Sequence, residues 1–547
     1  MTQSPEAYQA DVIIIGAGIS GIVTAIELLN ANKKVLILDR DEEKEIGGLA
    51  KWSFGGMFFA DSPVQRKAGI KDSVDLALKD WLSFAEFDPT DEGPKKWAEQ
   101  FVSLSTPHIH NWLVGKGISF FPVLNWVERG LFKPGNSLPR FHMVFGTGWE
   151  LAKVLSQHLL NHPKLSNLQI HYEHRVKELE AEGGRIVGVS GENLAAHETF
   201  SARGDIIVVA TGGINGNIEK LKENWYKPWG KPPEIILNGA HPYALGDMHE
   251  AVEQQKGSVI HLDRQWNYAA GVHHPNPRYS NHGLSLVPPK SALWVNYQGE
   301  RFGPMPLITA YDTRFLVEQI CKQPVKYSWQ ILNHKIMMKE FAISGSEHNE
   351  AMRDKKRLKF IMTVLMGNKK LVKHMLDDCK DFIVANSVEE LAEKMNELTG
   401  EGYVEKELLA DSIRRYDEQI DRGPKYFNDE QLRRIAHARQ YRGDRMRTSK
   451  FQKIDDPKAR PLIAIREFIL SRKSLGGIET DLQSRVLSQK DVSGKKEVIE
   501  GLYAVGEAAG FGGGNVHGHR ALEGTFLSGC VLSARVAAYS ILGKTLS

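Results

Sequence analysis

A glycine-rich turn directly after a short isoleucine-rich run is the feature of this sequence that most constrains the fold. The run from Asp11 to Ile15 is typical of a strand buried on both faces, and the turn follows as Gly16-Ala17-Gly18-Ile19-Ser20-Gly21. Gly16 permits a tight turn, Gly18 lets backbone approach a pyrophosphate, and Gly21 lets a helix pack on the strand. Asp39 ends a second apolar run 18 residues after Gly21, where a carboxylate can accept hydrogen bonds from a ribose. The sequence therefore predicts a dinucleotide-binding βαβ unit.

Length and composition set broad limits on the rest of the chain. A chain of 547 residues exceeds one ordinary core, so we expect two or three domains. The net charge of +3 gives no argument for nucleic acid or an anionic membrane as partner. Cys321, Cys379 and Cys530 are far apart, which predicts neither a disulfide framework nor an iron–sulfur centre. The short polar N-terminus and the lack of a long apolar run predict a soluble cytoplasmic protein without a membrane span.

Two further strands are predicted to end on glycine motifs. The run from Asp205 to Val209 leads into Ala210-Thr211-Gly212-Gly213, and the run from Gly501 to Val505 leads into Gly506-Glu507. Two glycine pairs, Gly47-Gly48 and Gly55-Gly56, follow the ribose-binding strand and can let backbone lie against a cofactor. Strand–glycine motifs at the start, middle and end of the chain indicate one long ligand such as FAD. Gly183-Gly184 separately predicts a hairpin turn.

In these motifs and their order, the chain resembles the flavoprotein family of fumarate reductases and succinate dehydrogenases, together with the 3-ketosteroid dehydrogenases. Leu475-Gly476-Gly477 and the run from Val516 to Gly529 complete the resemblance. It implies an α/β fold, with a Rossmann-like FAD-binding domain of the GR2 type interrupted by a smaller α+β cap domain that carries a helical insertion. We expect the FAD-binding domain at residues 1–258 and 478–547 and the cap at 259–477.

The resemblance also assigns roles toward a non-covalently bound FAD. It implies that Asp39 binds the adenosine ribose, that Val176 lies near the adenine, and that Glu507 contacts the ribityl or ribose side. A helix N-terminus near Gly524-Thr525 would stabilise negative charge at N1 and O2 of reduced flavin. The expected cofactor-binding residues are Gly16, Ala17, Gly18, Ile19, Ser20, Gly21, Asp39, Arg40, Gly47, Gly48, Leu49, Ser53, Gly55, Gly56, Val176, Ala210, Thr211, Gly212, Gly213, Asp247, Gly506, Glu507, Gly524, Thr525 and Leu527.

The implied reaction is desaturation or reduction of a CH–CH bond next to a carbonyl or carboxylate. It needs an acid or base for one proton, flavin for the hydride, and a group that polarises the substrate. Arg520 is similar in position to the carboxylate-binding arginine of fumarate reductases and is the first candidate for polarising the substrate. Tyr311 resembles the acid–base tyrosines of 3-ketosteroid dehydrogenases, and Lys473 is an alternative base. Trp266 and Tyr268 are further candidates.

Three other segments depart from the fumarate reductase pattern, which counts against a C4-dicarboxylate substrate. They are Asp263 to Tyr268, Thr309 to Asp312, and Arg472 to Ser474. His273, His274, His517 and His519 have no carboxylate or cysteine at ligand spacing, so no metal site is predicted.

Two classes of function stay open. One is an FAD-dependent enzyme on a small molecule such as a steroid-like or other hydrophobic cyclic ketone, with a fumarate reductase-like enzyme on a small acid as a variant. The other is a flavoprotein subunit that passes electrons to a partner through the basic helices near Lys355 and Lys369. An amine or aspartate oxidase is a more distant alternative. The sequence does not identify the electron acceptor.

Overall fold

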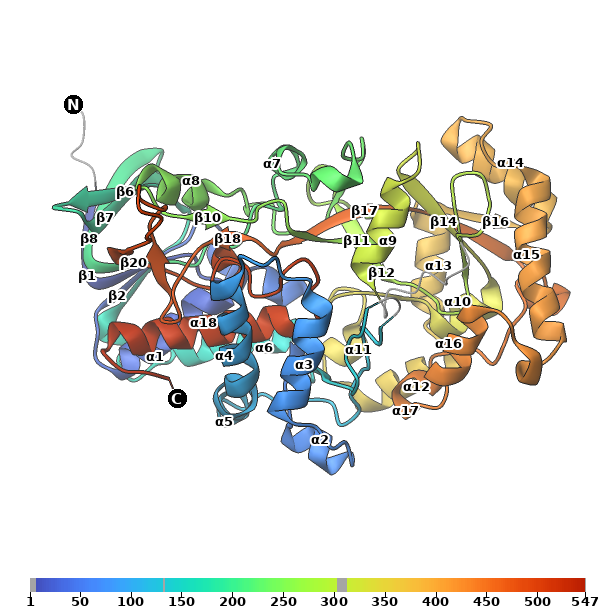
Figure 1. Ribbon diagram of the computed structural model, residues 1–547, viewed down its shortest axis with the longest axis horizontal. Coiled ribbons are helices and arrows are strands. Elements are labelled where there is room, and N and C mark those ends of the chain that lie inside the picture. Colours follow the sequence, from blue (N-terminus) through green and yellow to red (C-terminus); the bar gives the residue numbers. More distant parts are fainter. Residues whose placement is uncertain (1–5, 131–132, 303–311, 547) are drawn as a thin grey trace. The chain divides into compact units, whose positions relative to one another are not determined.

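The computed structural model describes residues 6–130, 133–302 and 312–546. The chain divides into two compact units, coloured along the sequence in Figure 1. Unit 1 comprises Met1–Asn224, Ala240–Trp266 and Lys473–Ser547, and unit 2 comprises Trp225–Gly239 and Asn267–Arg472. Both units combine helices and strands, so the predicted mixed α/β class is confirmed.

Parallel strands form the centre of unit 1. β1 (Glu6–Ile15) pairs with β2 (Val35–Leu38) on one side and β8 (Glu198–Val209) on the other, so that Ile14 lies between Ile37 and Val208. β5 (Leu168–His171) extends the sheet beyond β2, and β20 (Val498–Ala504) extends it beyond β8. The last residues of β1, β2 and β8 are buried, as expected for strands covered on both faces.

Each face of this sheet is covered by other elements of unit 1. Ile13 and Ile15 pack in a core that includes Val176, Val189 and Met248, which belong to β6 (His174–Glu182), β7 (Arg185–Asn193) and α8 (Asp247–Gln254). The helices α1 (Ile19–Asn30), α6 (Thr147–Leu160) and α18 (Thr525–Ile541) pack together, with α1 and α18 side by side in Figure 1. Because β1, β2, β8 and β20 are parallel, the glycine motifs that follow them meet at one edge of the sheet.

The remaining elements of unit 1 surround this framework. They are η1 (Glu43–Glu45), η2 (Gly48–Trp52), β3 (Gly56–Phe58), α2 (Pro63–Lys67), α3 (Val74–Ala85), α4 (Glu92–Leu104), the π-helical turn η3 (Ser105–His110), α5 (Asn111–Gly115), β4 (Phe141–Met143), η4 (Leu165–Asn167), α7 (Ile218–Glu223), β10 (Val259–Ile260), β18 (Gly477–Ile478), β19 (Arg485–Leu487) and η8 (Gly506–Ala509).

Unit 2 contains a mainly antiparallel sheet. β17 (Leu462–Ser474), which begins in unit 2 and ends in unit 1, pairs with β14 (Tyr327–Asn333) and β16 (Phe382–Ala385). β9 (Leu237–Asn238) is parallel to β17, which explains why residues 225–239 belong to unit 2. β11 (Gln265–His273) pairs with β12 (Gly283–Val287), which pairs with β15 (Ala342–Ile343), and β13 (Leu293–Val295) pairs with β14.

Helices dominate the second half of unit 2. They are α9 (Thr313–Cys321), α10 (His334–Glu340), α11 (Glu350–Arg353), α12 (Arg357–Met366), α13 (Lys369–Asp378), α14 (Val388–Thr399), α15 (Lys406–Asp421), α16 (Glu430–Ala438) and α17 (Arg442–Arg445). None of the helices in the described part of the chain is long and apolar enough to cross a membrane.

Candidate functional site

The turn between β1 and α1 has the geometry that its three glycines predict. Gly16 adopts φ +108°, and a Cβ there would lie 2.6 Å from the carbonyl oxygen of Ala210. A Cβ at Gly21 would lie 2.0 Å from the carbonyl oxygen of Gly16, so α1 packs against the turn. A Cβ at Gly18 would meet nothing within 4 Å, and no side chain caps α1. The start of α1, at Ile19 and Ser20, thus keeps space where a phosphate can approach the positive end of the helix.

Asp39 is held against this turn by backbone hydrogen bonds. Its Oδ2 accepts from the N–H of Ala17, and its Oδ1 accepts from the N–H of Asp41 at 2.7 Å. Burial raises the pKa of Asp39, and the two N–H donors oppose that effect. A carboxylate fixed at the end of β2 can still accept hydrogen bonds from a hydroxyl pair such as a ribose.

Arg40 and Asp247 form a charged group beside Asp39. Arg40 lies 3.4 Å from Asp247 and stacks over Tyr243, while Arg175 contacts the same carboxylate at 2.8 Å. Asp247 opens α8, and both arginines contact its carboxylate. Val176, the next residue after Arg175, is buried in the core of the sheet.

The first glycine pair after β2 lies beside the turn. The N–H of Gly47 donates to the carbonyl oxygen of Ala17 at 2.9 Å, and Gly47 forms a bridge with Gly18. Gly48 follows with φ +58° and begins η2, which contains the half-buried Leu49.

The second glycine pair is fixed by Ser53 and by the start of α6. Ser53 Oγ accepts from the N–H of Gly55 at 3.1 Å and donates to the carbonyl oxygen of Ala50. A Cβ at Gly55 would lie 2.7 Å from the backbone of Gly148, and one at Gly56 would overlap the ring of Phe141. Both glycines are therefore required by close packing.

The motifs after β8 and β20 lie together. Ala210 donates its N–H to Ile15, and Thr211 and Gly212 follow half-buried. A Cβ at Gly213 would lie 2.7 Å from Oε1 of Glu507, which accepts from the N–H of Ser474 at 2.9 Å. Gly506 has φ +64°, and its N–H donates to Ser533.

α18 begins at the same end of unit 1. Gly524 precedes it with φ +96°, and Gly524 accepts a hydrogen bond from the N–H of Phe58 at 2.9 Å. No side chain caps this helix; Thr525 Oγ1 instead lies 2.8 Å from Nε2 of His517. Leu527, two residues into the helix, is half-buried. The N-terminus of α18 is thus a second helix end at which negative charge is favoured.

His517 and Lys473 lie beside this helix end. Lys473 Nζ lies 3.8 Å from the centre of the Phe526 ring, an arrangement that stabilises a positive charge. His517 is fully buried and stacks on Trp81. Burial first, and then the charge of Lys473, lower the pKa of His517 to about 3, so this imidazole is neutral at physiological pH.

Arg520 is paired with a carboxylate that sequence reasoning did not identify. Its Nε lies 2.8 Å from Glu86 Oε2, and Lys133 contacts the other oxygen of Glu86 at 3.1 Å. Burial acts to raise the pKa of Glu86, but Arg520 and Lys133 together lower it. Arg520 and Lys133 thus contact the same carboxylate from two sides.

Trp266 is hydrogen-bonded to Glu523, which lies in the loop before α18. Its indole N–H donates to Glu523 Oε1 at 2.9 Å, and the N–H of Glu523 donates to the buried Glu128 at 3.1 Å. Unit 1 therefore brings Trp266 and Arg520 to the loop before α18, and Lys473 to the first turn of that helix. Tyr268 lies in unit 2 and packs against Leu237, Phe468 and Leu470, and Tyr311 lies outside the described residues.

The four histidines considered as metal ligands are dispersed. His519 lies 3.6 Å from Asp88, and His517 bonds Thr525, both in unit 1. His273 contacts Asp381 at 2.8 Å in unit 2, and its neighbour His274 is buried.

The residues of unit 1 fit a flavin dinucleotide. Two uncapped helix N-termini, at Ile19 and at Thr525, suit the phosphates and the anionic ring of such a cofactor. Asp39 supplies an acceptor for a ribose, and open space next to Gly18 lets the ligand approach the backbone.

Comparison with known proteins also indicates an FAD-binding protein. A family model described as an FAD-binding domain matches residues 11–527. A KsdD-like steroid dehydrogenase of Mycobacterium tuberculosis is 39% identical, over 97% of this chain and 95% of its own. The structure of a 3-ketosteroid Δ1-dehydrogenase from Sterolibacterium denitrificans superposes with a TM-score of 0.68 and 16% identity, covering 98% of this chain and 100% of the other. The structure of a flavocytochrome c3 fumarate reductase covers 100% of this chain and 80% of its own, with a TM-score of 0.66 and 19% identity.

Proposed function

The chain belongs to the FAD-binding family that includes the KsdD-like steroid dehydrogenases, and we propose that it desaturates a CH–CH bond next to the carbonyl of a steroid-like ketone. The single observation that carries this proposal is the 39% identity to such a dehydrogenase over nearly the whole of both chains. The departures of residues 263–268, 309–312 and 472–474 from the fumarate reductase pattern favour a ketone over a small dicarboxylate.

We propose that FAD is bound without a covalent link through the motifs of unit 1, from the turn at Gly16 to the start of α18. FAD supplies the two-electron acceptor for the hydride. The proposed cap corresponds to residues 259–477, and the proposed FAD-binding domain to the rest of the chain.

The protein's part in the reaction is to stabilise negative charge and to move one proton. Removal of a proton next to a carbonyl leaves an enolate, whose oxygen needs a donor or a cation. Arg520 can meet this need because its guanidinium is always charged and carries five N–H donors. Lys473 lies over Phe526 at the start of α18, where its charge can act electrostatically, and it stays the alternative base. Tyr311 and Tyr268 are the proposed hydroxyl groups for proton transfer.

Anaerobic mixing of the purified holoenzyme with candidate substrates tests the proposal. We expect 4-androstene-3,17-dione or its saturated 3-keto analogues to bleach the flavin absorbance within the instrument's time range, and succinate to leave it unchanged. Bleaching by succinate, together with no response to a panel of 3-ketosteroids, would refute the ketone assignment.

A further inference from the structure

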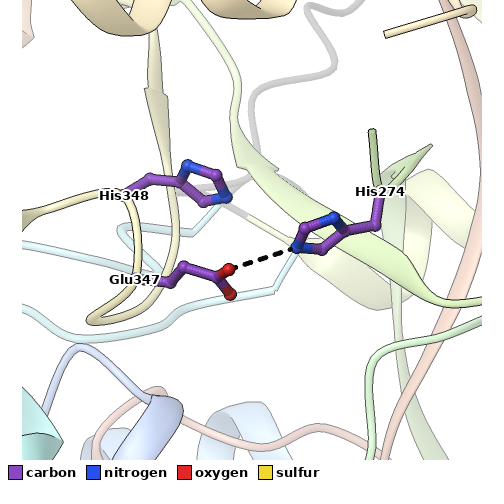
Figure 2. A group of neighbouring side chains, drawn as sticks. All are labelled: His274, Glu347 and His348. Carbon is purple, nitrogen blue, oxygen red and sulfur yellow. Dashed lines mark ion pairs between the residues drawn. The ribbon is translucent and has the colours of Figure 1, made fainter. Parts of the chain in front are cut away.

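Unit 2 contains a cluster of two histidines and a glutamate that the proposed reaction does not use. His274 directly follows the end of β11, and Glu347 and His348 lie in the loop between β15 and α11. The three side chains converge in Figure 2, and one ligand atom from each lies within 4.8 Å of the other two. Two imidazoles and a carboxylate form the donor set of many zinc sites.

Two buried nitrogen atoms of the cluster lack hydrogen-bond partners among the described residues. They are Nε2 of His274, whose residue is only 5% exposed, and Nε2 of His348. The contact between His274 Nε2 and Glu347 Oε1 is an ion pair at 3.5 Å, longer than a good hydrogen bond. Buried polar atoms are rarely left without a partner in native proteins, so these two nitrogens indicate a missing ligand.

The spacing suits a small divalent cation. Zn²⁺ binds imidazole nitrogen and carboxylate oxygen at about 2.1 Å, which places tetrahedral ligands about 3.4 Å apart. His274 Nε2 and Glu347 Oε1 already have that separation. Because the other separations reach at most 4.8 Å, side-chain rotation can bring His348 into range. We propose that His274, Glu347 and His348 bind one Zn²⁺ ion, with water as the fourth ligand.

The surroundings hold the carboxylate in a suitable orientation. Glu347 Oε2 accepts a hydrogen bond from Arg278, which leaves Oε1 for the metal. The side chain of Asn349 donates to the carbonyl oxygens of Ile343 and Gly345 at 2.8 and 2.7 Å and so fixes the loop. Such outer contacts orient metal ligands and tune their affinity.

Loading the site requires one local rearrangement. His274 Nδ1 accepts a hydrogen bond from the N–H of Asn276 at 2.9 Å, so Nε2 carries the proton of the neutral ring. A metal at Nε2 displaces that proton to Nδ1 and turns the Asn276 amide away. Asn276 is exposed, so water can accept its N–H. The bound ion would then link the end of β11 to the loop before α11 within unit 2.

The test is a Zn²⁺ titration of the full-length holoenzyme after chelator treatment, in competition with a chromophoric chelator. We expect one Zn²⁺ per chain in the parent protein. His348→Ala and the nearly isosteric Glu347→Gln should each weaken binding about a hundredfold or more, since each removes a direct ligand. Zn²⁺ should also raise the unfolding temperature of the parent but not of the two variants.

The control is His334→Ala. His334 is a half-buried histidine at the start of α10 in unit 2 and is not one of the three proposed ligands, so this variant should bind Zn²⁺ like the parent. FAD content and the unfolding temperature without metal show that each variant is folded. The proposal is overturned if the parent does not retain Zn²⁺ against the chelator. It is also overturned if both folded ligand variants bind like the parent, or if His334→Ala loses as much affinity as they do.

Discussion

Replacement of Asp39 by alanine should weaken FAD binding without preventing the protein from folding. Asp39 is the carboxylate at the end of β2, and its two oxygens are oriented by the N–H groups of Ala17 and Asp41. A hydrogen bond to a charged group contributes about 1.5–3 kcal/mol. Loss of the proposed ribose contact should therefore raise the Kd for FAD about ten- to 150-fold.

The same change has a separate effect on the FAD-free protein. Ala17 is only 1% exposed, so its N–H would lose its carboxylate acceptor in a buried position. An unsatisfied buried donor costs about 1–3 kcal/mol, which should lower the stability of the apoprotein. Because this loss is present with and without FAD, it must be measured separately from the affinity.

Fluorescence titration of FAD into apoprotein gives the affinity, and denaturant unfolding of apoprotein gives the stability. The matched control is Asp11→Ala. Asp11 also accepts a backbone hydrogen bond, from Lys34 at 2.8 Å, but it lies in β1 well before the glycine turn. Its loss should leave the FAD affinity unchanged. A folded Asp39→Ala apoprotein that binds FAD as tightly as the parent would refute the ribose assignment.

Three further predictions concern the two units. Denaturation with acid should release intact FAD into the supernatant, whereas flavin that precipitates with the protein would contradict non-covalent binding. Arg520→Lys should slow anaerobic flavin reduction by a confirmed steroid substrate about a hundredfold with FAD retained, because lysine lacks the fork of donors; an unchanged rate would contradict this role. Glu467→Gln should stabilise the protein at neutral pH. Burial first, and then the charge of Asp381, raise the pKa of Glu467 well above its usual value. Below pH of about 4.3, Glu467 is protonated in both the folded and the unfolded protein, and its burial costs no stability through ionisation. As pH rises from there toward the folded-state pKa, the free energy of unfolding falls by up to about 1.4 kcal/mol per pH unit. Unfolding curves of both proteins between pH 4 and 8 should diverge as pH increases, and parallel curves would exclude this effect.

Local patterns were sufficient where backbone geometry depends on neighbouring residues. The predicted tight turn at Gly16 and the close packing of the helix at Gly21 are present, because glycine is required wherever φ is positive or a Cβ would overlap backbone. Gly183 and Gly184 both adopt positive φ between β6 and β7, as the hairpin prediction requires. The buried runs after residues 11, 205 and 501 form β1, β8 and β20.

Contacts between distant segments could not be predicted in this way. Glu86 and Glu523 have no special sequence pattern, yet one pairs with Arg520 and the other accepts a hydrogen bond from Trp266. The sequence around His274 has no carboxylate at ligand spacing, because Glu347 comes close to it only through the pairing of β11, β12 and β15. Periodicity and spacing describe one segment at a time, whereas these pairs depend on how strands combine.

The charges around the start of α18 are consistent with one chemical task. Arg520 and Lys133 both contact Glu86, and Lys473 lies beside Phe526. The positive end of α18 acts in the same direction, and the neutral His517 does not add to it. We propose that these groups act together to stabilise a substrate enolate or an anionic reduced flavin during desaturation.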